Sequence, residues 1–160
     1  MPIDALQLAK LIECQAASLG LWVRGRCASP DDVVQEAFCR LAVAEPPPEN
    51  QVAWLYRVCR NLAEKQRLAD ARRKTREQAR ARPEVTGGGT DPIELAETLA
   101  AVENLEPELR EVVVARLWGQ LSLEEIGKLC GISTATAFRR YEEAVQELRS
   151  KLEPKWESRR

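Results

Sequence analysis

Residues 121–140 read LSLEEIGKLCGISTATAFRR, and this stretch decides the fold of the C-terminal half of the chain. Ser122 and Glu125 stand three residues apart, the spacing at which a serine and a glutamate cap the start of a helix reciprocally. Gly131 follows the apolar repeat, where glycine takes the left-handed conformation that a sharp turn requires. A capped helix, a tight turn and a second helix predict a helix-turn-helix over residues 121–152.

The second helix of this motif opens with small polar residues and continues with two arginines. Small side chains let the end of a helix lie deep in a major groove, and arginines contact phosphates or guanine edges. Glu142 and Glu143 follow after Tyr141 and would repel phosphate if they faced it. The alternative is a helical hairpin with no role in DNA binding. The residues expected to contact DNA are Ser133, Thr134, Thr136, Ala137, Arg139 and Arg140.

The composition of the 160 residues favours an all-α protein. Aromatic residues make up only 5%, so the core must be built mainly from Leu, Val and Ala, which suit helices better than a sheet. No run shows sustained period-two alternation. No apolar run approaches the ~20 residues of a membrane span, and the N-terminus lacks a basic-then-apolar signal pattern, so a cytoplasmic protein is expected.

The chain has five cysteines and no histidine. The cysteines are widely spaced and form no C-x-x-C pair, which argues against a Cys/His zinc site, and the lack of histidine closes the commonest route of acid–base catalysis. We therefore expect no metal and no cofactor. An enzyme is not excluded by these counts, although its easiest routes are closed. Buried free thiols in a reducing cytosol are the simplest interpretation of Cys14, Cys27, Cys39, Cys59 and Cys130.

Charge is distributed unevenly along the chain, although the net charge is only −1. Residues 51–82 hold ten basic and three acidic side chains, whereas both flanking segments are net acidic. Such a basic block is the local electrostatic footprint of a nucleic-acid binder, which the total charge conceals. A solvated helix face is the alternative interpretation.

Proline and glycine divide the chain into two helical regions. Residues 83–92 hold three consecutive glycines between two prolines, and we expect them to form a flexible linker. The expected fold is therefore two small helical domains, residues 1–82 and 93–160. The C-terminal domain is expected to begin with two helices, over residues 93–104 and 107–118.

Three helices are expected in the N-terminal domain, because apolar residues recur there at helical spacing. The first carries Leu6, Ala9, Ile12 and Leu19. The second begins at Pro30 with Ser29 as its cap, and its apolar face carries Val33, Val34, Ala37, Phe38 and Leu41. The third runs over about residues 51–80, with an inner stripe of Trp54, Leu55, Val58, Leu62 and Leu68.

Four stretches of the chain resemble the extracytoplasmic-function (ECF) group of the sigma-70 type sigma factors. Two match region two of that family, and the two later ones match region four. The resemblance covers roughly residues 8–80 and 93–152, in the family's order and with a linker between. The stretches are DDVVQEAF (31–38), AWLYRVCRNLA (53–63), LEPELREVV (105–113) and LSLEEIG (121–127).

The resemblance implies a sigma factor, which directs the RNA polymerase core to promoters while the polymerase performs the chemistry. In the family, the exposed face of the first region-two match binds the clamp helices of the largest polymerase subunit. Taken without the family, the same pattern describes an ordinary amphipathic surface helix. Here the face consists of Asp32, Gln35, Glu36 and Arg40.

The resemblance also implies contacts to the minus-ten promoter element from the third helix and the loop before it. Melted DNA presents one strand, which a basic groove follows while a pocket receives an unstacked base. Trp54 and Tyr56 are candidates for stacking on a base, although helical phase favours a core position for Trp54. Phosphate contacts are expected from Arg72, Arg73, Lys74 and Arg76. The residues implied for minus-ten binding are Asn50, Arg57, Arg60, Asn61, Lys65 and Arg67.

The recognition helix departs from the family at two places. Phe138 stands where a basic residue is common, and Glu142-Glu143 replaces a commonly basic pair. These departures concern the contacts to the minus-thirty-five element and not the motif itself. The family often uses an anti-sigma partner, and nothing in this sequence identifies one.

Two other functions remain open at this point. One is a stand-alone helix-turn-helix regulator whose N-terminal module dimerises or senses a ligand. The other is a protein-interaction module without DNA binding, which the acidic C-terminal half keeps open.

Overall fold

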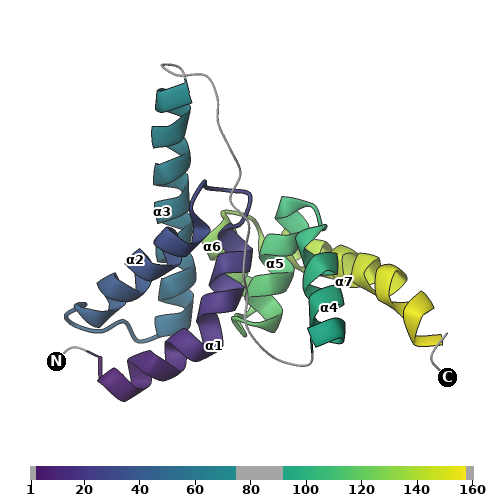
Figure 1. Cartoon of the computed structure of the whole chain (residues 1–160), viewed down its shortest axis with the longest axis horizontal. Coiled ribbons are helices and arrows are strands. Elements are labelled where there is room, and N and C mark those ends of the chain that lie inside the picture. Colours follow the sequence, from purple (N-terminus) through teal and green to yellow (C-terminus); the bar gives the residue numbers. More distant parts are fainter. Residues whose placement is uncertain (1–2, 75–91, 158–160) are drawn as a thin grey trace. The chain divides into compact units, whose positions relative to one another are not determined.

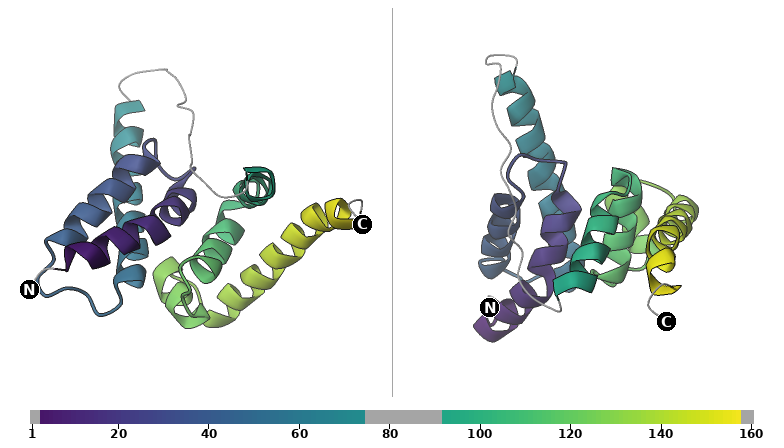
Figure 2. Two further views of the ribbon diagram at one scale, coloured as in Figure 1. Left: turned by 60° about the horizontal axis from the view of Figure 1, so that its bottom comes forward. Right: turned by 45° about the vertical axis from the view of Figure 1, so that its right-hand side comes forward.

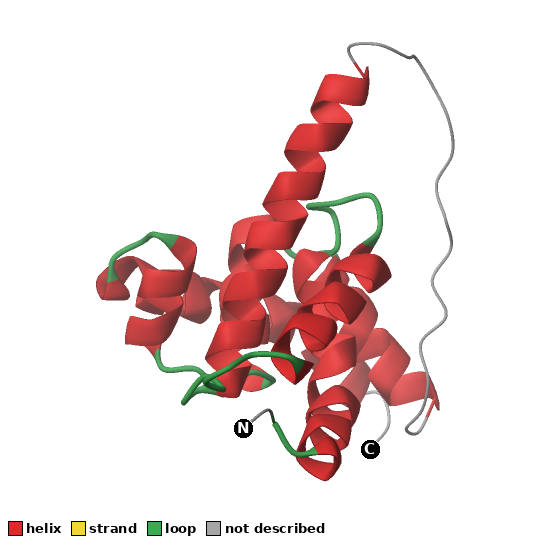
Figure 3. Cartoon of the chain, turned by 90° about the vertical axis from the view of Figure 1, so that its left-hand side faces the viewer, coloured by secondary structure: helices red, strands yellow, loops and turns green. Residues whose placement is uncertain are grey.

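The structure is a computed structural model that describes residues 3–74 and 92–157. Within these ranges the chain forms helices joined by loops, and no helix is long and apolar enough to cross a membrane (Figure 3). The backbone divides into two compact units, residues 1–86 and 87–160, and each is described by itself. The all-α prediction is confirmed. The expected linker, residues 83–92, lies outside the described residues except for Pro92, which begins a helix.

The described part of unit 1 forms three helices that pack against one another: α1 (Ala5–Val23), α2 (Pro30–Ala42) and α3 (Gln51–Lys74) (Figure 1). The C-terminal turns of α3 extend beyond α1 and α2. Residues 71–73 of these turns are exposed, which is consistent with the polar sequence of the second half of α3.

The core of unit 1 forms where the C-terminal half of α1 meets α2 and α3. The rings of Trp22 and Tyr56 lie edge to face with centroids 5.0 Å apart, and the Tyr56 hydroxyl donates to Ser18 Oγ at 3.2 Å. Burial raises the pKa of Tyr56, so the phenol stays neutral. All five apolar residues predicted for α2 are buried: Val33, Val34, Ala37, Phe38 and Leu41.

Residues 92–157 of unit 2 form four helices: α4 (Pro92–Glu103), α5 (Pro107–Leu117), α6 (Leu123–Cys130) and α7 (Thr134–Glu157). The long α7 packs against the other three (Figure 2). The fully buried residues that fill the space between the helices are Val102, Val112, Val113, Val114, Ala115, Ile126, Ala137 and Ala144.

Several expectations about single residues need correction. Ser29 precedes α2, but its side chain makes no capping hydrogen bond. Leu6 and Ile12 of α1 are exposed, because the N-terminal half of α1 lies beyond the core. Leu68 is 46% exposed and does not belong to the inner stripe of α3. The expected part of this helix beyond Lys74 lies outside the described residues.

The interpretation of the five cysteines as buried thiols is wrong for most of them. Cys59 alone among the five is buried, Cys27 and Cys130 are partly buried, and Cys14 and Cys39 are exposed. Burial raises the pKa of the Cys59 thiol to about 12.

Candidate nucleic-acid interface

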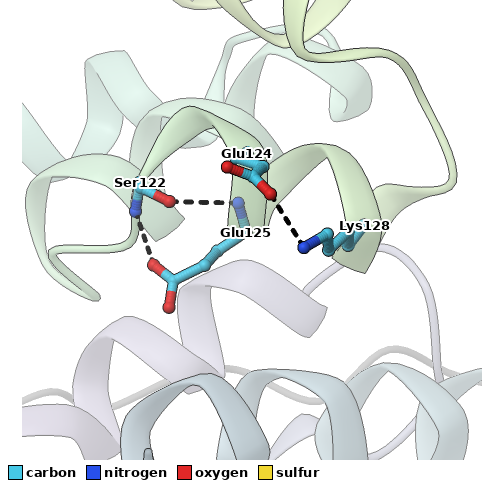
Figure 4. A network of polar contacts seen from close by, with 4 residues as sticks. All are labelled: Ser122, Glu124, Glu125 and Lys128. Atoms are coloured by element: carbon cyan, nitrogen blue, oxygen red, sulfur yellow. Dashed lines mark hydrogen bonds and ion pairs between the residues drawn. The ribbon is translucent and has the colours of Figure 1, made fainter.

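Two reciprocal hydrogen bonds close the start of α6. The backbone N–H of Glu125 donates to Ser122 Oγ at 3.1 Å, and the backbone N–H of Ser122 donates to Glu125 Oε2 at 2.8 Å (Figure 4). An ion pair between Lys128 and Glu124, 2.8 Å long, supports the same helix one turn further on. The predicted capping box is confirmed, and it fixes the first residue of the motif's first helix.

The turn between α6 and α7 depends on two glycines. Gly131 ends α6 with φ of 69°, the left-handed conformation predicted for it. The Ile132 N–H donates to the Gly127 carbonyl at 2.9 Å. A Cβ on Gly127 would lie 2.9 Å from the carbonyl oxygen of Ile132, which is closer than a real Cβ comes to such an atom. Sequence reasoning missed Gly127, because this close approach exists only once the turn has formed.

Ser133 caps the start of α7. Its Oγ accepts the backbone N–H of Thr136 at 3.1 Å, and its hydroxyl donates to Thr136 Oγ1 at 2.9 Å. Ser133 and Thr134 are exposed, and Thr136 is partly buried. The first turn of α7 therefore presents short polar side chains at the positive end of the helix dipole, a setting that suits an approaching phosphate.

Two α7 residues predicted to contact DNA point toward other helices of unit 2 instead. Ala137 is 0% exposed and belongs to the inward face of α7 together with Ala144, so the prediction of a DNA contact by Ala137 is wrong. Arg140 Nη2 lies 2.6 Å from Glu108 Oε2 on α5, and the arginine side chain is only 22% exposed. Arg139 is thus the more exposed of the two arginines.

The outer surface of α7 also carries the residues that depart from the family. Phe138 is 52% exposed, and Glu142 and Glu143 are exposed one turn further along. The surface changes from short and neutral at the start of the helix to aromatic and then acidic. An acidic face disfavours phosphate, so the first turns are the part of α7 that suits DNA.

The polar face of α2 lies on the surface as predicted. Asp32, Gln35, Glu36 and Arg40 are all exposed. Arg40 Nε donates to Glu36 Oε1 at 2.7 Å, and both side chains are about half exposed. An exposed pair of this kind contributes little to stability. Because both side chains are about half exposed, both charges are accessible to a partner.

The basic residues of α3 lie mainly on its solvent side. Arg57, Asn61 and Lys65 are exposed and follow one another at intervals of four residues, so they form one stripe along the helix. Arg60 is partly buried beside this stripe. Arg67 forms two hydrogen bonds with Glu64, at 2.7 and 3.0 Å, which lower the pKa of that carboxyl.

Other candidates for the minus-ten contact have different positions from those expected. Asn50 caps α3, since its Oδ1 accepts the backbone N–H of Ala53 at 3.0 Å. Tyr56 is 0% exposed, so the prediction that it stacks on a base is wrong. Trp54 is only partly buried, and the aromatic core position belongs to Tyr56 instead. Lys74 and Arg76 lie outside the described side chains.

Among the described residues, no group of three or more Cys, Asp or Glu side chains is placed to hold a metal ion.

The comparisons with known proteins concern both units. The family model "Sigma-70, region 4" matches residues 95–148, which include the helix-turn-helix. The ECF RNA polymerase sigma factor SigE of Mycolicibacterium smegmatis is 32% identical over 135 residues. That alignment covers 76% of this chain and 51% of SigE, so the chain spans about half the length of this relative.

A solved structure shares the fold. It is the sigma factor RpoE of Bartonella quintana in complex with the anti-sigma factor NepR. The TM-score is 0.65 at 17% sequence identity, and the match covers 92% of this chain and 97% of RpoE. The region-four match and the similarity to SigE support an ECF factor of the sigma-70 family, and the RpoE match shows that the fold is shared.

Proposed function

We propose that this chain is a sigma factor that directs core RNA polymerase to specific promoters and helps to open them. The observation that carries the proposal is the capped helix-turn-helix, which lies within the region-four match and exposes the first turn of its second helix. The proposal assigns no catalytic residue to the chain, because the polymerase supplies the chemistry. It places the protein in the cytoplasm, where polymerase and promoter DNA are found.

The core polymerase is proposed to bind the polar face of α2. Its four residues, Asp32, Gln35, Glu36 and Arg40, are exposed together and leave the apolar face of α2 in the core. The clamp helices of the largest subunit are the proposed partner surface. An anti-sigma factor, such as the one that accompanies RpoE in the solved complex, is a further proposed partner.

The minus-ten element is proposed to bind along the solvent side of α3. Arg57, Asn61 and Lys65 supply a basic and hydrogen-bonding stripe, flanked by Arg60 and Arg67. Such a stripe follows the backbone of one melted strand, and sequence selectivity then comes from the loop before Gln51. Asn50 lies at the end of that loop, where its side-chain Oδ1 caps α3.

The minus-thirty-five element is proposed to bind the start of α7. The accessible set is Ser133, Thr134, Thr136 and Arg139, with Arg140 positioned by its pair with Glu108. Two DNA-binding surfaces that are weak alone bind more tightly when one chain carries both. Once the first surface is bound, the second binds at a high effective concentration.

In vitro transcription with core polymerase and a promoter library tests the proposal. We expect the full chain to yield promoter-specific transcripts, as a control sigma factor does, and to bind promoters poorly without core polymerase. The proposal fails if the control gives specific transcripts and this chain gives none. Tight binding of the chain alone to a duplex with a two-fold symmetric site would indicate a stand-alone regulator instead.

A further inference from the structure

Phe138 is an exposed aromatic residue on a helix whose inward face is already filled. Its side chain is 52% exposed, whereas Ala137 and Ala144, which face the core of unit 2, are 0% exposed. Single apolar residues are common on protein surfaces, so exposure alone has little meaning. The position of Phe138 on α7 is the informative part.

Phe138 comes one turn after two short, exposed residues at the start of α7. It is the fifth residue of the helix, and Thr134 and Ala135 lie one turn before it on the same side. Both are exposed and short, so they allow the helix backbone to come close to a groove. Phe138 is then the first long side chain on this side of the helix, at the depth where base edges lie.

The chemistry of the phenyl ring restricts what Phe138 recognises. It has no hydrogen-bond donor or acceptor, so it gains nothing from the polar edges of guanine, adenine or cytosine. In the major groove the one apolar feature of a base pair is the C5-methyl group of thymine. Glu142, one turn later on the same side, disfavours an approach to the phosphate backbone and leaves a base edge as the neighbour that fits.

We propose that Phe138 determines specificity by packing its ring against the methyl group of a thymine in the upstream promoter element. The inference rests on the proposed function and adds to it the identity of one base. Arg139, exposed beside Phe138, would hold the adjacent phosphate and so position the ring.

The test uses deoxyuridine, which lacks only the methyl group of thymidine. A promoter selected by the library experiment is prepared with each upstream thymidine replaced in turn, and holoenzyme binding is measured by competition. We expect one position at which deoxyuridine weakens binding about fourfold, the effect of one buried methyl group. The Phe138→Ala holoenzyme should bind the promoter with thymidine at that position and the promoter with deoxyuridine there equally well.

Two further variants sharpen the result. Leu117→Ala removes a side chain of the same unit that is 49% exposed, and it should keep the full fourfold discrimination. Phe138→Arg should shift the preferred base at the affected position from thymine toward guanine. Thermal unfolding of the Phe138→Ala chain should match that of the wild type, since the side chain is largely outside the core.

Three results would overturn the inference. Deoxyuridine could have no effect at any upstream position, Phe138→Ala could retain the discrimination, or Phe138→Ala could weaken binding to the polymerase core alone, which would assign the ring to a protein contact. Failure of the proposed function looks different, because the library then yields no promoter with the wild-type chain.

Discussion

Gly127 and Gly131 lie four residues apart and meet different needs of the same turn. Gly131 supplies a positive φ of 69°, which residues with a Cβ rarely adopt. Gly127 is a helical residue, and what matters there is the missing side chain, because the Ile132 carbonyl oxygen occupies the space of a Cβ. The position of the recognition helix thus depends on the close approach of two backbone segments.

Replacing Gly127 by alanine is expected to destabilise unit 2 by about 1–3 kcal/mol, the usual cost of forcing an extra carbon into a packed site. Chemical denaturation followed by circular dichroism measures the change. Gly20→Ala is the matched control, since that glycine is also helical but has nothing within 4 Å of its Cβ position. The control should be neutral or up to about 1 kcal/mol more stable. Equal effects at the two sites would contradict the close-approach argument.

The cysteines should differ sharply in reactivity. Cys14 and Cys39 are exposed, whereas the pKa of the buried Cys59 thiol is raised to about 12. At pH 8 we expect iodoacetamide to label the two exposed thiols and to reach Cys59 only after unfolding, as mass spectrometry of the peptides would show. An unfolded chain loses the Cys59 proton near pH 9, before the folded chain does, so this group lowers stability as the pH rises above 9. Rapid labelling of Cys59 in the native protein would refute its burial.

At the scale of elements, the helices were predictable where caps and periodicity agree. The α2 stripe and the capping box of α6 follow directly from residue spacing. The helical phase of α3 does not, because a helix that extends past its neighbours has no continuous apolar stripe to fix that phase. Leu68 therefore lies on the solvent side with Lys65. In the packed first half of α3 the buried face is rotated by about one residue from the expected stripe, so Tyr56 takes the core position expected of Trp54.

The exposed face of α2 gives a prediction that separates binding from stability. Glu36→Gln breaks the ion pair with Arg40 and should change the free energy of unfolding by less than about 1 kcal/mol. It should weaken binding to core polymerase about tenfold, or about 1.4 kcal/mol, if this face is the interface. Glu124→Gln is the matched control, because Glu124 is also an exposed acid in an i,i+4 pair. Competition with labelled wild-type chain for the core would show both effects, and unchanged affinity of Glu36→Gln would count against the α2 interface.

At the scale of the whole molecule, the chain combines two units with different charge. The basic residues concentrate in the part that contains α3, while the residues that follow the expected linker are net acidic. Long-range attraction to DNA is therefore expected to come from unit 1, and unit 2 to contribute close contacts in one groove. This division was visible in the sequence. The contact set within unit 2 was not, because the burial of Ala137 and the pairing of Arg140 depend on tertiary packing.

The salt dependence of promoter binding measures how much the basic residues of unit 1 contribute to DNA affinity. Lys65→Ala should weaken promoter binding by the holoenzyme and reduce the magnitude of the slope of log K against log salt by about 1, the effect of one lost phosphate contact. Lys10→Ala removes an exposed charge of the same unit, on α1, and should leave the slope unchanged. Fluorescence anisotropy over a series of salt concentrations gives both slopes. Identical slopes for the two variants would remove the α3 stripe from the DNA contact.

The ion pair between Glu108 and Arg140 has a consequence for how promoter preference can change. Glu108 belongs to α5, yet its carboxylate holds an arginine of the recognition helix at 2.6 Å. A neutral residue at position 108 would release that guanidinium while leaving every residue of α7 intact. A genetic selection for altered promoter preference is therefore expected to return substitutions at Glu108 as well as on α7, as second-site changes that act from outside the recognition helix.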